Sequence, residues 1–230
     1  MSSTLTSIPQ KPIKASTIFT FIPNLIGYSR VFTLIASFFT MKTHPIFTMG
    51  VLYSTSCLLD AFDGYAARTF NQSTKFGAVL DMVTDRCSTS SLIVFLAVLY
   101  PNWFIFWQLM ISLDLASHYM HMYASLVSGS TSHKSLKKDT NVLLRLYYEN
   151  RTVLFFVCAL NELFYMALYL DHYNFSKLPI INISIPRILV FISLPIWFFK
   201  QFMNVIQLIN ASNILAEVDA TSYNERNKLN

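Results

Sequence analysis

Long apolar runs separated by short polar segments dominate this sequence of 230 residues. An apolar run of about 18 to 25 residues is long enough for a helix to cross a hydrocarbon core about 30 Å thick. The pattern predicts six such helices, over residues 20–40, 44–63, 77–98, 103–123, 152–172 and 187–210. We therefore expect an all-α membrane protein that folds as a bundle of six transmembrane helices.

Polar segments border this helical region at both ends of the sequence. Residues 1–19 lack a basic stretch followed directly by a short apolar core and a cleavage site, so we expect no cleaved signal peptide. We assign residues 1–19 to a cytosolic N-terminal segment, residues 20–212 to one integral membrane domain and residues 213–230 to a cytosolic C-terminal tail. The polar residues 223–230 are typical of a disordered terminus.

Composition indicates the same class of protein. Hydrophobic residues make up 53% of the chain and charged residues only 13%, which is too apolar for an ordinary soluble domain of this length. The formal net charge is +5, but the basic residues flank the predicted helices and form no separate soluble module. We therefore expect anionic lipid headgroups and diphosphates as partners, and no nucleic acid.

Basic residues are unevenly shared between the two sides of the predicted bundle. One side carries the larger set, namely Lys11, Lys14, Lys134, Lys137, Lys138, Arg145 and Arg151. The other side carries mainly Lys42, Lys177 and Arg187. Because positive residues favour the cytosolic side, we expect both termini in the cytosol.

Four aspartates lie within the second and third predicted helices. They form two pairs, each on one face of its helix: Asp60 with Asp63, and Asp81 with Asp85. If the two helices are antiparallel neighbours joined by a short turn over residues 69–76, all four carboxylates can converge. Carboxylates are unfavourable in a bilayer, and hard divalent ions prefer oxygen ligands. The spacing therefore predicts a site for two ions, Mg²⁺ or Mn²⁺.

Small residues and two polar residues accompany the acids. Gly64 and Ala67 continue the face of the first acidic pair, and Gly77 lies on the partner helix, so bulk is absent where a flat ligand could approach. Arg68 offers a guanidinium fork suited to phosphate oxygens, and Thr74 offers a hydroxyl beside it. Together these residues predict a site for a nucleotide diphosphate. The alternatives are a structural network of ion pairs and a cation pathway, in which the glycines only allow close helix packing.

The same segment resembles a known family. It matches every fixed position of the CDP-alcohol phosphatidyltransferase signature, namely Asp60, Asp63, Gly64, Ala67, Arg68, Gly77, Asp81 and Asp85. Upstream, residues 23–30 (Pro-Asn-Leu-Ile-Gly-Tyr-Ser-Arg) are similar to the family's first-helix motif, with Gly27 where threonine is commoner.

The resemblance implies roles for these positions. Two metal ions would be held by Asp60, Asp63, Asp81 and Asp85, and Asp85 would also deprotonate the attacking alcohol. A second set would contact the CDP-lipid, namely Asn24, Gly64, Ala67, Arg68, Thr74 and Gly77.

Polar side chains also follow one face of the fourth predicted helix and one face of the sixth. The first stripe is Asp114, His118, His121 and Ser125, and the second is Lys200, Asn204 and Gln207. Such groups either bond one another across helix interfaces or line a wet cavity for a polyhydroxylated acceptor. We name His118, His121, Lys200 and Glu162 as the candidate acceptor pocket. The two histidines have no third strong ligand nearby, so we predict no zinc.

These stripes and their neighbours narrow the resemblance. Residues 117–126, 132–134, 150–151, 161–165, 200–201 and 204–211 are similar to the eukaryotic family members that use myo-inositol. The implied reaction moves the phosphatidyl group of CDP-diacylglycerol to myo-inositol, giving phosphatidylinositol and CMP. The resemblance also implies a homodimer in the endoplasmic reticulum or Golgi membrane, with the active site facing the cytosol. Alternative acceptors are glycerol 3-phosphate, serine, choline and ethanolamine; a non-enzymatic cation carrier and a purely structural membrane protein are alternatives of another class.

Overall fold

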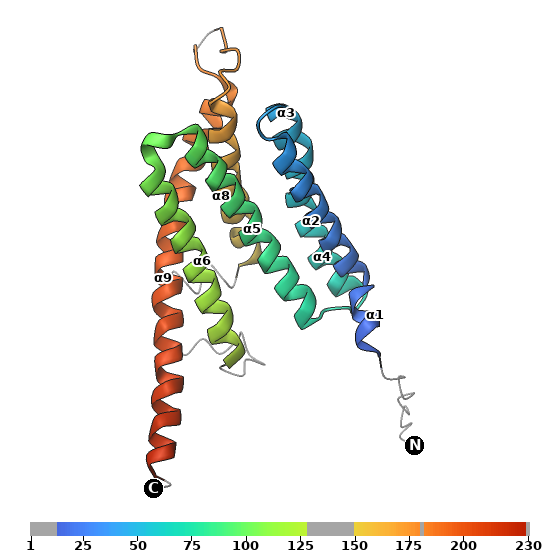
Figure 1. Cartoon of the computed structure of the whole chain (residues 1–230), viewed down its shortest axis with the longest axis vertical. Helices are drawn as coiled ribbons and strands as arrows, with labels where there is room; N and C mark the ends of the chain where they lie inside the picture. The colour runs from blue at the N-terminus through green and yellow to red at the C-terminus, as the bar shows by residue number, and fades with distance from the viewer. Residues whose placement is uncertain (1–12, 128–149, 180–181, 229–230) are drawn as a thin grey trace. The chain divides into compact units, whose positions relative to one another are not determined.

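The computed structural model describes residues 13–127, 150–179 and 182–228. Within these residues the helical elements are α1 (Ala15–Phe19), α2 (Ile22–Thr40), α3 (Pro45–Phe47), η1 (Thr48–Tyr53), α4 (Ser54–Thr69), α5 (Lys75–Leu99), η2 (Pro101–Trp103), α6 (Phe104–Val127), α8 (Arg151–Asp171) and α9 (Ile185–Lys228), as shown in Figure 1. The described part contains one isolated antiparallel bridge, between Lys177 and Ser184, and no longer strand. The prediction of an all-α protein is confirmed.

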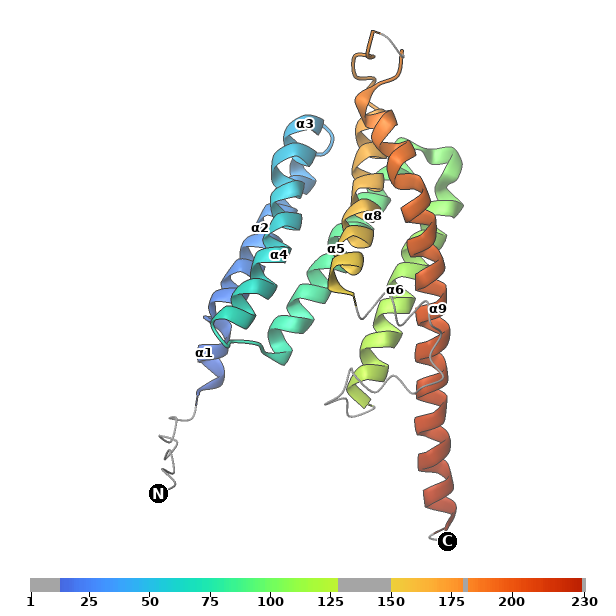
Figure 2. The ribbon, with the colours of Figure 1, turned by 180° about the vertical axis from the view of Figure 1, so that it is seen from behind.

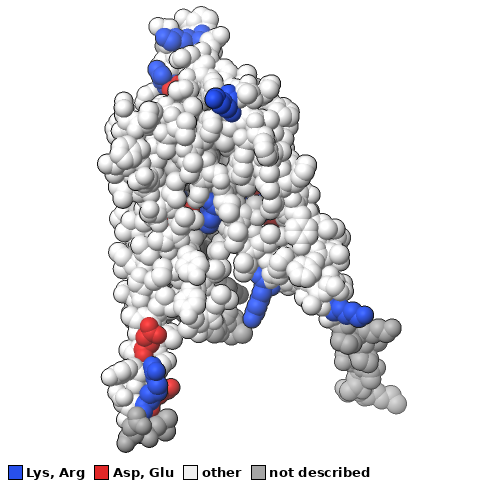
Figure 3. Space-filling view, viewed as in Figure 1, with Lys and Arg blue, Asp and Glu red and all other residues white. Residues whose placement is uncertain are grey.

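Five helical segments in the described ranges are long and apolar enough to cross a membrane. They are Ile22–Thr40, Pro45–Thr69, Lys75–Leu99, Thr152–Asp171 and Ile185–Lys228, close to five of the predicted spans. The surface in Figure 3 is largely uncharged, as expected for helices that face lipid. The 24 residues of α6 are also long enough to span a bilayer, but α6 is not among these five segments. The number six therefore stays a prediction.

The chain divides into two compact units, Met1–Asp85 and Arg86–Asn230, and the boundary falls inside α5. In the first unit, α2 packs along η1 and α4, which lie beside it in both Figure 1 and Figure 2. In the second unit, α9 packs against both α6 and α8. The assignment of residues 20–212 to one integral domain stays a prediction.

The two units have different cores. In the first, fully buried side chains of α2, η1 and the intervening turn include Leu34, Met41, Met49 and Tyr53. The second is centred on Trp197 of α9, which stacks on Phe164 of α8 with ring centroids 4.8 Å apart. Large aromatic side chains contribute much of the apolar area that packs one helix on another.

The second membrane-spanning segment is less regular than the sequence predicted. Residues 48–53 form a π-helical stretch, η1, between α3 and α4. Its polar groups are satisfied locally, since Thr48 Oγ1 donates to Thr40 Oγ1 (2.7 Å) and Ser54 Oγ donates to the Met49 carbonyl (2.5 Å). A π-helical turn widens the helix and rotates the residues that follow. It therefore helps to set which face of α4 meets α2.

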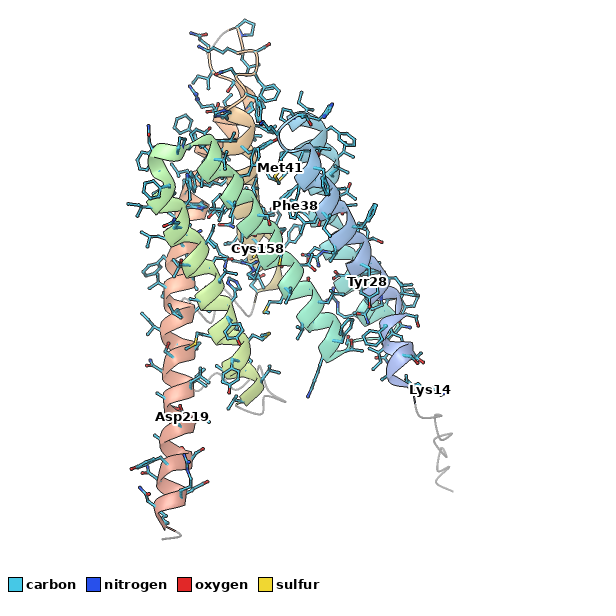
Figure 4. All side chains as sticks on the ribbon, in the orientation of Figure 1. Lys14, Tyr28, Phe38, Met41, Cys158 and Asp219 are labelled. Carbon is cyan, nitrogen blue, oxygen red and sulfur yellow. The ribbon has the colours of Figure 1, made fainter. Side chains whose placement is uncertain are left out.

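The C-terminal prediction was wrong in one respect. We expected a helix to end near residue 210 and a disordered terminus over residues 223–230, but α9 continues to Lys228. Asp219, labelled in Figure 4, lies well within this helical extension. The residues after Ala211 are mostly polar, but they include neither glycine nor proline, the two residues that most disfavour a helix. Polarity here ends the apolar run without ending the helix.

Candidate active site

The turn between α4 and α5 is held by hydrogen bonds at the end of α4 and at the start of α5. Asn71 has a positive φ of 56°, and the amide of Gln72 donates to the Ala67 carbonyl at 2.9 Å. This left-handed residue with a bond back into the last turn is a Schellman motif, and asparagine tolerates the conformation better than most residues. Thr74 Oγ1 then accepts from the amide of Gly77 at 3.0 Å and caps α5. The chain reverses direction here, as predicted, which Figure 1 shows.

This reversal brings the four predicted aspartates together around one arginine of α2. Nη1 of Arg30 contacts Asp63 Oδ2 at 2.8 Å and Asp81 Oδ1 at 2.5 Å. Nη2 contacts Asp60 Oδ1 at 2.8 Å and Asp85 Oδ1 at 2.5 Å. Carboxylate oxygens of Asp60, Asp63 and Asp81 lie within 4.8 Å of one another. The predicted convergence of the acidic faces is therefore present in the structure.

The cluster is closed on one side and open on the other. The side chains of Arg30 and Asp63 are 3% and 10% exposed, whereas those of Asp60 and Asp81 are 42% and 44% exposed. Three carboxylates at this separation form an oxygen-rich donor set that fits a hard divalent cation. The open side provides a route by which such an ion and a charged ligand can reach the acids.

A cavity of about 210 Å³ lies beside the cluster, within the first unit. Its walls include Asp63 and Asp81 together with all six predicted CDP-lipid contacts, namely Asn24, Gly64, Ala67, Arg68, Thr74 and Gly77. The remaining lining residues are Pro23, Gly27, Gln72, Ser73, Ala78 and Leu80. The structure thus gathers the predicted residues on one surface, while their role in binding stays a prediction.

Three glycines line this cavity where an added side chain would collide or crowd, and a Cβ added to Gly27 would lie 2.9 Å from Leu80 Cδ2. A Cβ added to Gly77 would lie 2.8 Å from Asn24 Oδ1 and 3.2 Å from Thr74 Oγ1. A Cβ added to Gly64 would lie 3.4 Å from Nη1 of Arg68, which can move because it ends a flexible side chain. The contact at Gly77 is more restrictive than the contact at Gly64, because Asn24 is buried and its amide donates to the Ile18 carbonyl at 2.5 Å.

Gln72 was not predicted as part of the site. Its side-chain carbonyl accepts from the amide of Ile22 at 3.0 Å, which fixes the start of α2 to the turn after α4. Gln72 also lines the cavity. A polar residue in the short connection of the acidic motif was the available signal, but sequence spacing does not reveal that its partner lies 50 residues upstream.

The candidate acceptor residues lie in the second unit, on α6, α8 and α9. His118 Nδ1 lies 2.8 Å from the Asp114 carbonyl oxygen, and Glu162 accepts from Thr89 Oγ1 at 2.6 Å. Lys200 is 3% exposed, and its Nζ donates to Asn204 Oδ1 at 2.6 Å. His121, on α6, is half-buried.

A second arginine belongs to this polar group. Nη1 of Arg86 donates to both carboxylate oxygens of Asp114, at 2.6 and 2.8 Å. Arg86, Asp114 and Glu162 all lie close enough to Lys200 to interact with it electrostatically. A charged group in the second unit therefore includes most of the predicted acceptor pocket, whose function stays a prediction.

Sequence reasoning missed the two arginines that organise these clusters. Arg30 is the last residue of the first-helix motif, and Arg86 belongs to none of the motifs or polar stripes of the sequence. Each lies inside a long helix with an apolar composition, and an intramembrane charge is itself a signal for a nearby partner. Of the basic residues used to predict orientation, Lys11, Lys134, Lys137, Lys138 and Arg145 lie outside the described residues, as does the segment 132–134.

Comparison with known proteins finds relatives that match most of the chain. The profile of the CDP-alcohol phosphatidyltransferase family matches residues 20–215. The chain is 57% identical over 222 residues to a protein of Candida albicans named CDP-diacylglycerol–inositol 3-phosphatidyltransferase, covering 96% of this chain and 93% of the relative. Proteins of the same name match at 53% identity in Saccharomyces cerevisiae (96% of this chain, 97% of the relative) and at 49% in Homo sapiens (88% and 94%).

No solved structure matches the chain. The family assignment rests on the sequence match, which spans both units and includes the acidic cluster, the cavity and the second polar group. This chain belongs to the CDP-alcohol phosphatidyltransferase family.

Proposed function

We propose that this chain is a phosphatidylinositol synthase, which transfers the phosphatidyl group of CDP-diacylglycerol to myo-inositol and releases CMP. The observation that carries the proposal is the gathering of Asp60, Asp63 and Asp81 beside a cavity walled by small residues and Arg68. The choice of inositol is supported by relatives of that name at 49 to 57% identity over most of the chain.

The acidic cluster is suited to two divalent ions, Mg²⁺ or Mn²⁺. Asp60, Asp63 and Asp81 offer oxygens within 4.8 Å of one another, and Asp85 adds a fourth carboxylate on the same arginine. Bound there, divalent ions would neutralise charge on a diphosphate and hold it in one orientation. The aspartates provide the anionic ligands that this chemistry requires.

The cavity beside the cluster is suited to the diphosphate and cytidine end of CDP-diacylglycerol. Arg68 is exposed on the cavity wall, and its planar guanidinium can bond two phosphate oxygens at once. Gly64, Ala67 and Gly77 place no bulky side chain on the cavity wall, so the ligand can lie against the helix backbone. The Thr74 hydroxyl accepts from the Gly77 amide and still has its own proton to donate.

Asp85 is the proposed general base. Its carboxylate accepts the proton of an inositol hydroxyl while that oxygen forms a bond to the phosphorus that carries diacylglycerol. The bond from this phosphorus to the bridging oxygen breaks, and CMP leaves with that oxygen. The proton remains on Asp85 until solvent removes it, which its 36% exposed side chain permits.

The role of Asp85 can be tested by Asp85→Asn, which keeps the size of the side chain and removes the base. We expect turnover to fall by about 10²- to 10⁴-fold, the range typical of a general base. Binding of CDP-diacylglycerol, measured by quenching of intrinsic fluorescence or by equilibrium dialysis, should change much less. Undiminished synthesis would remove Asp85 from this role.

The charged group in the second unit, around Lys200, is the proposed acceptor pocket. His118, His121, Glu162 and Lys200 offer both donors and acceptors, as recognition of a polyol requires. Conservative changes such as Glu162→Gln should therefore raise the KM for inositol more than the KM for CDP-diacylglycerol. Equal changes in the two KM values would indicate a structural role for Glu162.

The cellular setting is also a proposal. The protein is multi-pass in the membrane, and we propose the endoplasmic reticulum or the Golgi as its location, with the site on the cytosolic side and a homodimer as the assembly. The sequon at Asn71 tests the orientation, because a cytosolic turn would carry no glycan. Glycan at Asn71 would reverse the proposed topology.

One assay tests the reaction and the acceptor together. The purified protein is incubated with CDP-diacylglycerol, Mg²⁺ or Mn²⁺ and one of five alcohols: myo-inositol, glycerol 3-phosphate, serine, choline or ethanolamine. We expect CMP and phosphatidylinositol in equal amounts, and only with inositol. Release of CMP with another alcohol would identify that alcohol as the acceptor. Ion flux in proteoliposomes without release of CMP would indicate a cation carrier.

A further inference from the structure

Arg30 connects the acidic faces of α4 and α5 through both of its terminal nitrogens. Its Nη1 bridges Asp63 of α4 and Asp81 of α5. Its Nη2 bridges Asp60 of α4 and Asp85 of α5. Each terminal nitrogen thus joins one aspartate from each helix, an arrangement that a planar guanidinium permits and a single ammonium group does not.

A main-chain contact ties the part of α2 around Arg30 to α4. Arg30 is buried on α2, and its carbonyl oxygen accepts from Ser56 Oγ of α4 at 3.1 Å. Its Nε is also buried and has no hydrogen-bond partner among the described residues. A buried N–H without a partner is unfavourable, so the position of the guanidinium is determined by the acids.

The charges in this cluster do not balance. One guanidinium faces four carboxylates, so the group retains an attraction for further cations. The oxygens that Arg30 occupies belong to the same carboxylates that are suited to divalent ions. Arg30 and an ion are both positive and are attracted to the same four carboxylates, so each weakens the hold of the cluster on the other.

We propose that Arg30 is an exchangeable counter-cation: it holds the four aspartates together without divalent ions and releases carboxylate oxygens when ions bind. This inference rests on the metal site of the proposed function. Arg30 is a positioning residue in this scheme, because it acts on the aspartates and needs no contact with the substrate. Its presence lowers the affinity for ions and stabilises the ion-free protein.

The experiment measures ion binding and thermal stability, and neither depends on turnover. Wild-type protein and the Arg30→Met and Arg30→Lys variants are purified in detergent with Mn²⁺, which is then removed with a chelator. Free Mn²⁺ is titrated by electron paramagnetic resonance, and the melting temperature is recorded with and without the ion. Arg187→Met is the matched control, because Arg187 pairs with Asp171 and contacts none of the four clustered aspartates in the described residues.

Arg30→Met should bind Mn²⁺ at least about tenfold more tightly than wild type, since a competing positive charge has been removed. In chelator its melting temperature should fall by about 5 °C or more, and Mn²⁺ should restore most of the loss. Arg30→Lys should fall between wild type and Arg30→Met in both measurements. Arg187→Met should bind Mn²⁺ as wild type does.

Unchanged or weaker Mn²⁺ binding in both Arg30 variants would overturn the proposal, as would unchanged stability in chelator. If Arg30→Met does not fold, Arg30→Lys alone carries the comparison, and equality with wild type in either measurement overturns it. Failure of the metal site itself would be seen separately, because wild-type protein would then bind no Mn²⁺. That result would also overturn the proposed exchange between Arg30 and divalent ions.

Discussion

The two units of this protein differ in how their aspartates are paired with arginines. In the first unit, four aspartates surround Arg30, and two of the four remain more than 40% exposed. In the second unit, Asp114 receives two hydrogen bonds from Arg86, and Asp171 receives two from Arg187. The comparison separates acids that have a cation each from acids that share one.

The difference has a functional meaning. An acid matched by its own arginine needs no ligand, and its main effect is to join helices. Acids that outnumber their cations beside a cavity remain able to bind ions. We therefore propose that aspartate has a structural role in one unit and a ligand-binding role in the other, and that local charge balance distinguishes the two roles.

The largest expected effect is on activity and comes from the acid-rich cluster. Asp81→Asn removes one negative charge that faces both Arg30 and the cavity. We expect turnover to fall by about a thousandfold or more, since several kcal/mol of charge stabilisation depend on the ion site. CMP release from CDP-diacylglycerol and inositol measures it.

Asp171→Asn is the matched control, because it removes the same charge from a pair outside the cluster. Its turnover should remain within a few-fold of wild type. Equal losses in Asp81→Asn and Asp171→Asn would remove the distinction between the two units.

The second effect is on stability and comes from the matched pairs. Asp114→Ala removes one partner of a buried ion pair that joins α5 to α6. Breaking such a pair typically costs about 3 kcal/mol or more, so the melting temperature should fall by several degrees. Mn²⁺ should not restore it. Restoration by Mn²⁺ would indicate that Asp114 belongs to an ion site after all.

A smaller effect should follow from filling the cavity wall. Gly77→Ala places a methyl group 2.8 Å from Asn24 Oδ1, which is buried and cannot easily retreat. Overpacking of this kind costs about 1 to 3 kcal/mol, and we expect the KM for CDP-diacylglycerol to rise about tenfold. Gly50→Ala is the control, because a Cβ there meets nothing within 4 Å. A similar KM for both variants would argue against a ligand at Gly77.

The smallest effect should come from Gly64→Ala. The added methyl would lie 3.4 Å from Nη1 of Arg68, whose side chain can shift. We expect the KM for CDP-diacylglycerol to rise two- to threefold, because the guanidinium must move by only a few tenths of an ångström. A larger effect than that of Gly77→Ala would mean that the position of Arg68 is more tightly required than the contacts of Asn24.

The sequence predicted the acidic cluster because its information is local. Two pairs of aspartates at helical spacing, separated by a short turn, leave few ways to arrange their carboxylates. The cavity wall could be predicted for the same reason, since Gly64, Ala67 and Arg68 lie within five residues of one another on α4. Residues close in the chain and constrained by one helix can be placed from spacing alone.

The features that the sequence did not predict depend on residues far away in the chain or on where and how a helix deviates or ends. Arg30 lies 30 residues or more before the aspartates that it bridges, and no spacing rule connects α2 to them. The end of α9 was misplaced because the end of an apolar run marks where contact with lipid is expected to end, whereas a helix can continue through polar residues that include no glycine or proline. The π-helical residues 48–53 were read as ordinary helix, since hydropathy carries no signal for one extra residue in a turn.

The central claim is that the acidic faces of α4 and α5 hold divalent ions together. Mn²⁺ titration of the purified protein, followed by electron paramagnetic resonance, tests it most directly. We expect about two Mn²⁺ per chain with spin coupling between them, and loss of this signal in an Asp63→Asn/Asp81→Asn double variant. Absence of saturable binding, or the same coupled signal in the double variant, would contradict the account.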